Sequence, residues 1–149
     1  MHRRRLIAGV AAIGALLAGR AVADTPTVAP ELCLPVADQT LAWIADTMPV
    51  PGHRVTGPAV AYRAPGFEKV WFVAAYADGK PAVWAINTIT EDHGVTLSVT
   101  DGAKAATGWF HADTSAAKIT DKEPGVAEAM ACLAGIATPV ASPLATPAH

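Results

Sequence analysis

The side chains best suited to acid–base or metal chemistry are two histidines that stand beside acids. His93 directly follows Glu91 and Asp92, and His111 lies two residues before Asp113. An imidazole beside a carboxylate can relay a proton or bind a metal ion. Neither spacing matches a zinc signature such as H-E-x-x-H, which places two histidines on one helix face. His93, His111 and Asp113 are therefore the candidates for a small hydrolase or metal-dependent enzyme, and the competing interpretation is a pair of solvated loops.

Other catalytic patterns are missing from the sequence. The serines beyond residue 23 are Ser98, Ser115 and Ser142, and none lies in a G-x-S-x-G turn. The acids in the second half of the chain lack the spacing of a calcium-binding loop, and the two cysteines do not form a C-x-x-C pair. We therefore expect no cofactor and no bound metal, and we assign no catalytic residue.

The N-terminal segment predicts export from the cytoplasm. Three arginines at positions 3–5 precede an apolar run over residues 6–18, and the small residues before Asp24 place a cleavage site after Ala23. As a helix the apolar run would rise about 20 Å, against about 30 Å for a hydrocarbon core. We therefore predict a signal peptide over residues 1–23, with a retained membrane anchor as the alternative. Because adjacent arginines are also found in twin-arginine export signals, this export route is a second interpretation of the segment.

Removal of this segment changes the charge of the chain. Residues 1–23 hold four of the eleven Lys and Arg and none of the thirteen Asp and Glu. The mature chain is left with a formal charge of −6, and its cations are dispersed. Nucleic acids and anionic membranes both require clustered cations, so we expect neither as a partner, and we expect no stable membrane insertion after cleavage.

The two cysteines, Cys33 and Cys132, lie near the two ends of the mature chain. In an oxidising compartment an even number of cysteines indicates a disulfide bond, with two free thiols as the alternative. The sequence thus predicts a Cys33–Cys132 bridge and a secreted, periplasmic or cell-envelope location.

Hydrophobic periodicity predicts helices and strands in alternation with turns. The predicted helices cover residues 36–48 and 121–134, with Asp121 as N-cap and Gly135 as the end of the second helix. The predicted strands cover residues 59–63, 70–77, 81–88 and 94–101, with one helical turn over residues 102–107.

The strongest of these signals is a hairpin closed by Asp78 and Gly79. With a two-residue loop, Tyr76 pairs with Pro81 and Val73 pairs with Trp84. Both faces of this hairpin are apolar, so it requires cover on both sides. Residues 94–101 instead alternate apolar and polar residues, which predicts a half-exposed strand near an edge of the sheet.

Together these observations predict an α+β fold. A three- or four-stranded antiparallel meander packs with an N-terminal and a C-terminal helix, and the bridge pins both helices over one face. The expected organisation is a lead-in over residues 24–30, one globular domain over residues 31–135, and a flexible Ala/Thr/Pro-rich tail over residues 136–149.

The expected function is a non-catalytic domain that binds a protein or a small molecule outside the cytoplasm. The enzyme built on the His93 and His111 loops is the alternative, and a structural module of the cell envelope is a third hypothesis.

Overall fold

The β3–β4 hairpin lies at the centre of the fold. The computed structural model describes residues 25–137, and in it β3 (Trp71–Ala77) pairs with β4 (Lys80–Ile86) in the predicted register. Asp78 and Gly79 both have positive φ, 51° and 77°, as a type I′ turn requires. The predicted signal peptide (residues 1–23), its cleavage site between Ala23 and Asp24, and the tail residues 138–149 lie outside the described residues.

The sheet has five strands, so the prediction of three or four was wrong. They follow one another in the order β1-β2-β3-β4-β5, with every neighbouring pair antiparallel. The remaining strands are β1 (Leu34–Pro35), β2 (Val55–Arg63) and β5 (Thr96–Ser98). β1 escaped prediction because two residues carry no periodicity. β2 begins four residues earlier than predicted, because its register shifts around the Gly57–Pro58 peptide, a sequence that resembles a turn.

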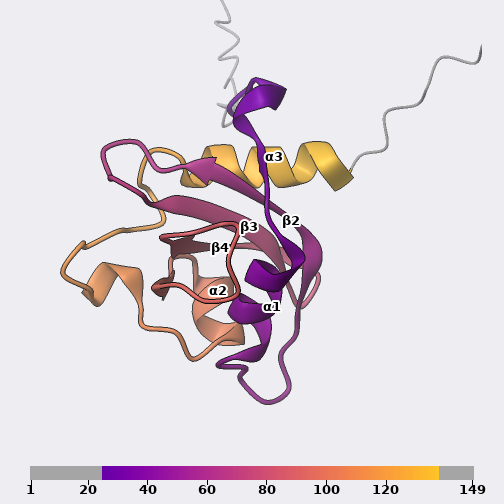
Figure 1. Cartoon of the computed structure of the whole chain (residues 1–149), viewed down its shortest axis with the longest axis vertical. Helices are drawn as coiled ribbons and strands as arrows, with labels where there is room; N and C mark the ends of the chain where they lie inside the picture. The colour runs from indigo at the N-terminus through magenta and orange to yellow at the C-terminus, as the bar shows by residue number, and fades with distance from the viewer. Residues whose placement is uncertain (1–24, 138–149) are drawn as a thin grey trace, which may run out of the picture.

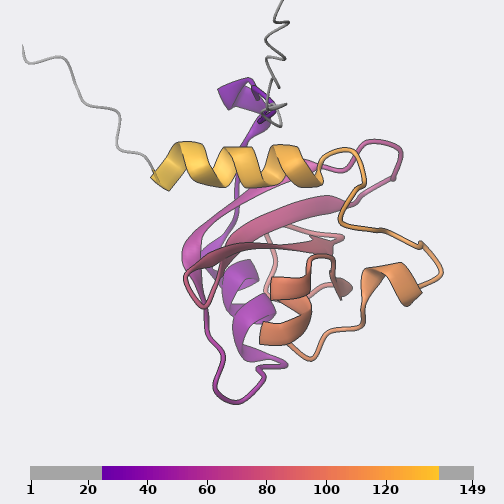
Figure 2. The same ribbon diagram turned by 180° about the vertical axis from the view of Figure 1, so that it is seen from behind.

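Helices cover both faces of the sheet. Figures 1 and 2 show α3 (Val126–Ala137) over one face, with α1 (Asp38–Asp46) and α2 (Asp101–Ala106) under the other. Two short 3-10 helices complete the order, η1 (Pro30–Leu32) and η2 (Ala112–Thr114). The prediction that both terminal helices lie on one face was wrong. A single face cannot hold them, because the apolar hairpin also needs cover on its other side.

The two layers have separate cores. On the α3 face, Val126, Ala129 and Leu133 pack with a cluster that includes Phe72 and Val83. On the opposite face, Ile44 of α1 and Ala103 of α2 pack with a cluster that includes Val73, Trp84 and Ile86. The alternating residues of one hairpin thus supply both cores.

All four tryptophans of the chain lie on the α1/α2 face. Trp84 and Trp109 are buried there, and Trp43 and Trp71 pack against the same cluster. The rings of Trp43 and Trp109 lie 5.4 Å apart, and the Trp109 indole N–H donates to the Ile44 carbonyl at 2.9 Å. The α3 face contains no tryptophan, so tryptophan fluorescence reports the α1/α2 layer alone.

Strand β5 differs from the half-exposed strand that was predicted. It does lie at an edge of the sheet, but its polar residues Thr96 and Ser98 are buried, whereas Val95 is 68% exposed. The hydroxyl groups have partners beneath α1 and α2. The Trp43 indole N–H lies 3.1 Å from the Thr96 hydroxyl, and the Ser98 hydroxyl lies 3.3 Å from that of Thr107. Polar residues are buried without penalty when their hydrogen bonds are formed.

Helix α3 begins and ends later than predicted. Asp121 is not its N-cap, because the chain first turns at Gly125, which has a φ of +101° and lies against Pro65 and Phe72. The Gly125 N–H donates to the Glu128 carboxylate at 2.8 Å, which is the glutamate half of a capping box. Gly135 does not end the helix, which continues to residue 137 and so takes in the first two residues of the predicted tail.

The hydroxyl of Thr107 gives a test of the buried network. It accepts from the Trp84 indole N–H at 3.0 Å and donates to the Ala103 carbonyl at 2.9 Å. We expect Thr107→Val to lower the free energy of unfolding by about 1–3 kcal/mol, because the indole N–H loses its partner in a buried site. Urea unfolding followed by circular dichroism measures the change, and Thr56→Val at an exposed position of β2 is the control. Equal unfolding midpoints for the two variants would contradict this account.

Candidate functional site

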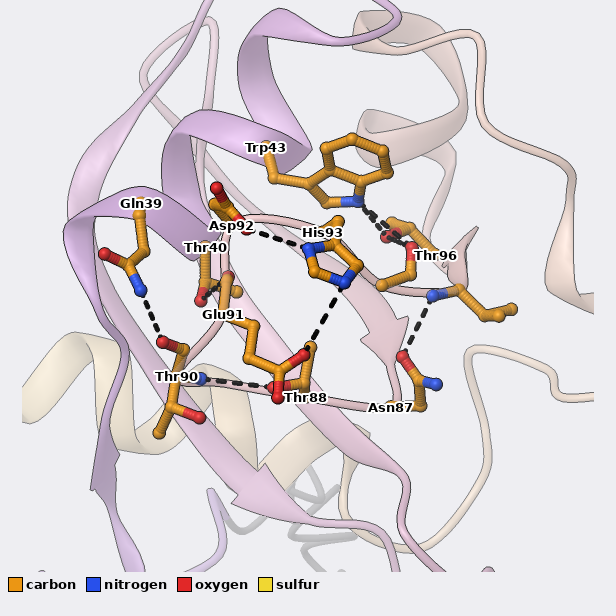
Figure 3. Close-up of polar contacts among 12 residues, drawn as sticks. Gln39, Thr40, Trp43, Asn87, Thr88, Thr90, Glu91, Asp92, His93 and Thr96 are labelled. Carbon is orange, nitrogen blue, oxygen red and sulfur yellow. Dashed lines mark hydrogen bonds and ion pairs between the residues drawn. The ribbon is translucent and has the colours of Figure 1, made fainter.

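The first sequence candidate, His93, lies in the loop between β4 and β5. Helix α1 holds this loop in place, because three of its side chains donate to three loop carbonyls (Figure 3). The bonds run from Gln39 to the Thr90 carbonyl at 2.6 Å, from Thr40 to the Glu91 carbonyl at 2.6 Å, and from Trp43 to the Gly94 carbonyl at 3.1 Å. The loop is thus an ordered part of the α1 layer.

Gly94 allows the loop to close tightly. A Cβ atom at this position would lie 2.8 Å from both the Asn87 side-chain oxygen and the Thr88 methyl group. The same Asn87 oxygen accepts the Val95 N–H at 2.9 Å. A side chain at position 94 would therefore displace the group that fixes the return of the chain into β5.

His93 lies between two carboxylates. Its Nδ1 atom is 2.8 Å from Asp92, its Nε2 atom is 3.9 Å from Glu91, and its side chain is 72% exposed (Figure 3). The Asp92 hydrogen bond raises the pKa of His93, and the charges of both acids add to this effect. The same hydrogen bond lowers the pKa of Asp92. The two acids thus stabilise the protonated form of His93 at the protein surface. The arrangement is a solvent-exposed ion pair.

The other two candidates lie after α2, in and beside η2. His111 is exposed, and its carbonyl accepts the Thr114 N–H at 3.2 Å. The Asp113 carboxylate lies 3.1 Å from the Lys104 ammonium group, whose hydrogen bond lowers the pKa of Asp113. Within residues 25–137, no hydrogen bond or ion pair links His111 or Asp113 to His93, and no three His, Cys, Asp or Glu residues are placed to hold a metal ion.

His53 has an acidic partner that the sequence analysis did not find. Its Nδ1 atom lies 2.6 Å from the Asp78 carboxylate, which also accepts the Arg54 N–H at 2.9 Å. The His53 hydrogen bond is the main cause of the lowered pKa of Asp78. These contacts tie the hairpin turn to the start of β2, so they are structural.

An apolar hollow lies away from these loops, between the N-terminal segment and α3. We call it the cystine groove. It has a volume of about 490 Å³ and its lining residues are all uncharged. They are Thr25, Pro26, Val28, Pro30, Cys33, Ala131, Cys132, Ala134, Gly135 and Ile136.

The predicted disulfide forms part of the lining of this groove. Cys33 and Cys132 are bonded across a sequence separation of 99, with a Cα–Cα distance of 5.5 Å. The bridge holds the N-terminal segment beside the last turns of α3, and Figures 1 and 2 show this segment passing α3 on its way to the sheet. Pairing of the cysteines already implied that residues 25–32 lie near residues 131–136, and that signal could have found the groove.

The bridge is a covalent tie between the outer wall of the groove and α3. Both hydrogen bonds that start within residues 25–33 also end there, from Leu32 to Ala29 and from Cys33 to Pro30. Val28 adds one half-buried contact with the α3-side core. Ordering a backbone residue costs about 1–2 kcal/mol, whereas complete burial of one valine contributes about 1.5–3 kcal/mol. The covalent bond therefore adds a constraint on this wall beyond its partial burial.

A smaller apolar hollow of about 200 Å³ lies beside β4 and β5. Its lining residues include the exposed Val95 together with Leu97 and Ile119. Only apolar surface faces this hollow, so it offers contact without hydrogen bonds.

Comparisons of this chain with protein-family models, with curated proteins and with solved structures find no match.

Among the helices within residues 25–137, none is both long enough and apolar enough to span a bilayer. The Cys33–Cys132 bridge is compatible with an oxidising location outside the cytoplasm.

The ion pair at His93 gives a measurable pKa. We expect His93 to titrate above its ordinary value of about 6.5, and Asp92→Asn to lower this pKa by removal of the hydrogen-bonded carboxylate. Because the folded-state pKa is raised, the small stabilisation by this pair is present below the ordinary value and is lost as the pH rises through the raised one. Proton NMR of the imidazole ring measures the pKa. Asp121→Asn serves as the control, and an unchanged His93 pKa in Asp92→Asn would refute the assignment.

Proposed function

We propose that this chain is an exported, non-catalytic binding domain and that its ligand lies in the cystine groove. The observation that carries the proposal is an uncharged hollow of about 490 Å³, a volume within the range of small-molecule sites. The signal peptide predicted over residues 1–23 supports a secreted, periplasmic or envelope location, where the ligand would be met.

The lining of the groove favours an uncharged and largely apolar ligand. Among its residues only Thr25 carries a hydroxyl group, and the others offer aliphatic, proline or cystine surface. A carboxylate or phosphate placed here would find no cation among the lining residues that the structure describes, and it would approach a mature chain of negative formal charge. Binding would come from burial of apolar area, at about 25 cal/mol per Å². An apolar stretch of a partner protein and an apolar small molecule both fit this description.

The histidine loops support an enzyme less well. His93 and Asp113 each have a separate charged partner, and both partnerships lie at the surface. A catalytic site needs a base, its orienting group and a position for substrate within hydrogen-bond reach of one another. In the described residues, the cystine groove and these loops share no residue.

The neutral dye Nile red tests the proposal on the oxidised chain that begins at Asp24. We expect saturable binding with enhanced emission. Ile136→Glu should weaken it at least tenfold, because it places a charge at the rim, and Ala131→Phe should weaken it similarly by filling the groove.

Two matched controls separate the groove from general surface effects. Phe110→Glu introduces the same charge at an exposed apolar position outside both hollows, and Ala127→Phe introduces the same ring at an exposed position of α3. Both controls should bind the dye as the parent does. If the groove variants and the controls bind equally, the groove is not the binding site.

A further inference from the structure

Resting on the proposed function, we propose that the Cys33–Cys132 bond is a latch. Oxidation of the two thiols forms the cystine groove and switches ligand binding on, and reduction opens the groove and switches it off. The class of co-reactant is a dithiol or its disulfide.

The bridge lies in the wall of the groove itself. Cys33 and Cys132 are both lining residues, so the bond forms part of the surface that a ligand would contact. Cys132 is buried on α3, whereas Cys33 is half-buried on the N-terminal segment. A thiolate that enters the groove therefore reaches the Cys33 sulfur more easily than the Cys132 sulfur.

The sheet and α3 have packing and pairing contacts of their own, apart from the bridge. α3 is held on the sheet by buried Val126, Ala129 and Leu133. β1 follows Cys33 in the chain and is held by its own pairing with β2, through Leu34 opposite Ala61. Breaking the bond therefore releases residues 25–33, which form one wall of the groove, and leaves the sheet and its helices in place.

The chemistry balances as a two-electron exchange. A reductant thiolate attacks the Cys33 sulfur, the sulfur–sulfur bond breaks, and Cys132 leaves as a thiolate that takes up a proton. The second thiol of the reductant then attacks the mixed disulfide and releases Cys33 as a thiolate, which also takes up a proton. The reductant becomes a cyclic disulfide, and the reverse sequence closes the latch.

This latch would couple binding to export. In a reducing compartment the chain would have an open groove and no affinity for the ligand. After transfer to an oxidising compartment, the bond would close and the groove would form. The protein would thereby acquire its binding activity only where the ligand is found.

The test uses two independent readouts on the chain that begins at Asp24. Nile red binding reports the groove, and the emission of the four tryptophans reports the opposite face of the sheet. Both are measured at low temperature in the oxidised protein, in the protein reduced with excess dithiothreitol, and in the Cys33→Ser/Cys132→Ser double variant. We expect dye binding at least tenfold weaker in the two unbridged forms, with unchanged tryptophan emission and with recovery after reoxidation of the parent.

A variant that keeps the bridge distinguishes the effect of altering the wall of the groove from the effect of breaking the disulfide bond. Val28→Asp places a charge on the wall and should weaken dye binding in the oxidised state. If it does so while the reduced parent binds as tightly as the oxidised one, the groove is the site but the latch is refuted. If reduction abolishes both dye binding and native tryptophan emission, the bond supports the whole fold and the latch is likewise refuted. Failure of the oxidised parent to bind the dye would overturn the proposed function itself.

Discussion

The structure depends on one constraint, which is that the β3–β4 hairpin is apolar on both faces. An antiparallel hairpin usually leaves one face to water, and its sequence then alternates apolar and polar residues. Here both sets of alternating residues are buried, Phe72 and Val83 on one face and Val73 and Trp84 on the other. Because both faces of the hairpin are apolar, each face must be covered by another part of the chain. α3 covers one face, and α1 with α2 covers the other.

This constraint also explains where the bridge lies. Since α1 and α3 are on opposite sides of the sheet, a disulfide near the chain ends cannot join them directly. It joins α3 to the segment before β1, at the edge of the sheet, through Cys33. The segment therefore crosses α3 before it enters the sheet, and the cystine groove lies between the two (Figure 1). The apolar groove is thus a consequence of the two-sided hairpin together with the bridge.

Features set by neighbouring residues could be predicted from the sequence. The hairpin register followed from the Asp78-Gly79 turn. The ion pair of His93 is similarly local, because its acids are adjacent in the chain. The bridge spans 99 residues, but it too was predictable, because two cysteines allow only one intramolecular pairing.

Features set by distant contacts could not be predicted in the same way. The buried hydroxyl groups of β5 depend on Trp43 and Thr107, which are remote in sequence. The start of α3 depends on the packing of Gly125 against Pro65 and Phe72. The cysteine pairing indicated where the groove lies, but not that Ile136 lines it, because Ile136 was assigned to the tail.

The position of the bridge has a mechanical consequence for the described body. Thr25 and Ile136 line the same groove, so the two ends of this body emerge close together. A pulling force applied between them would pass through residues 25–33, the sulfur–sulfur bond and the end of α3. All five strands lie between Cys33 and Cys132 in the sequence, and they would carry none of this load. If the protein is held at both ends, the sheet would therefore stay folded under a pulling force that would unfold the same domain without its bridge.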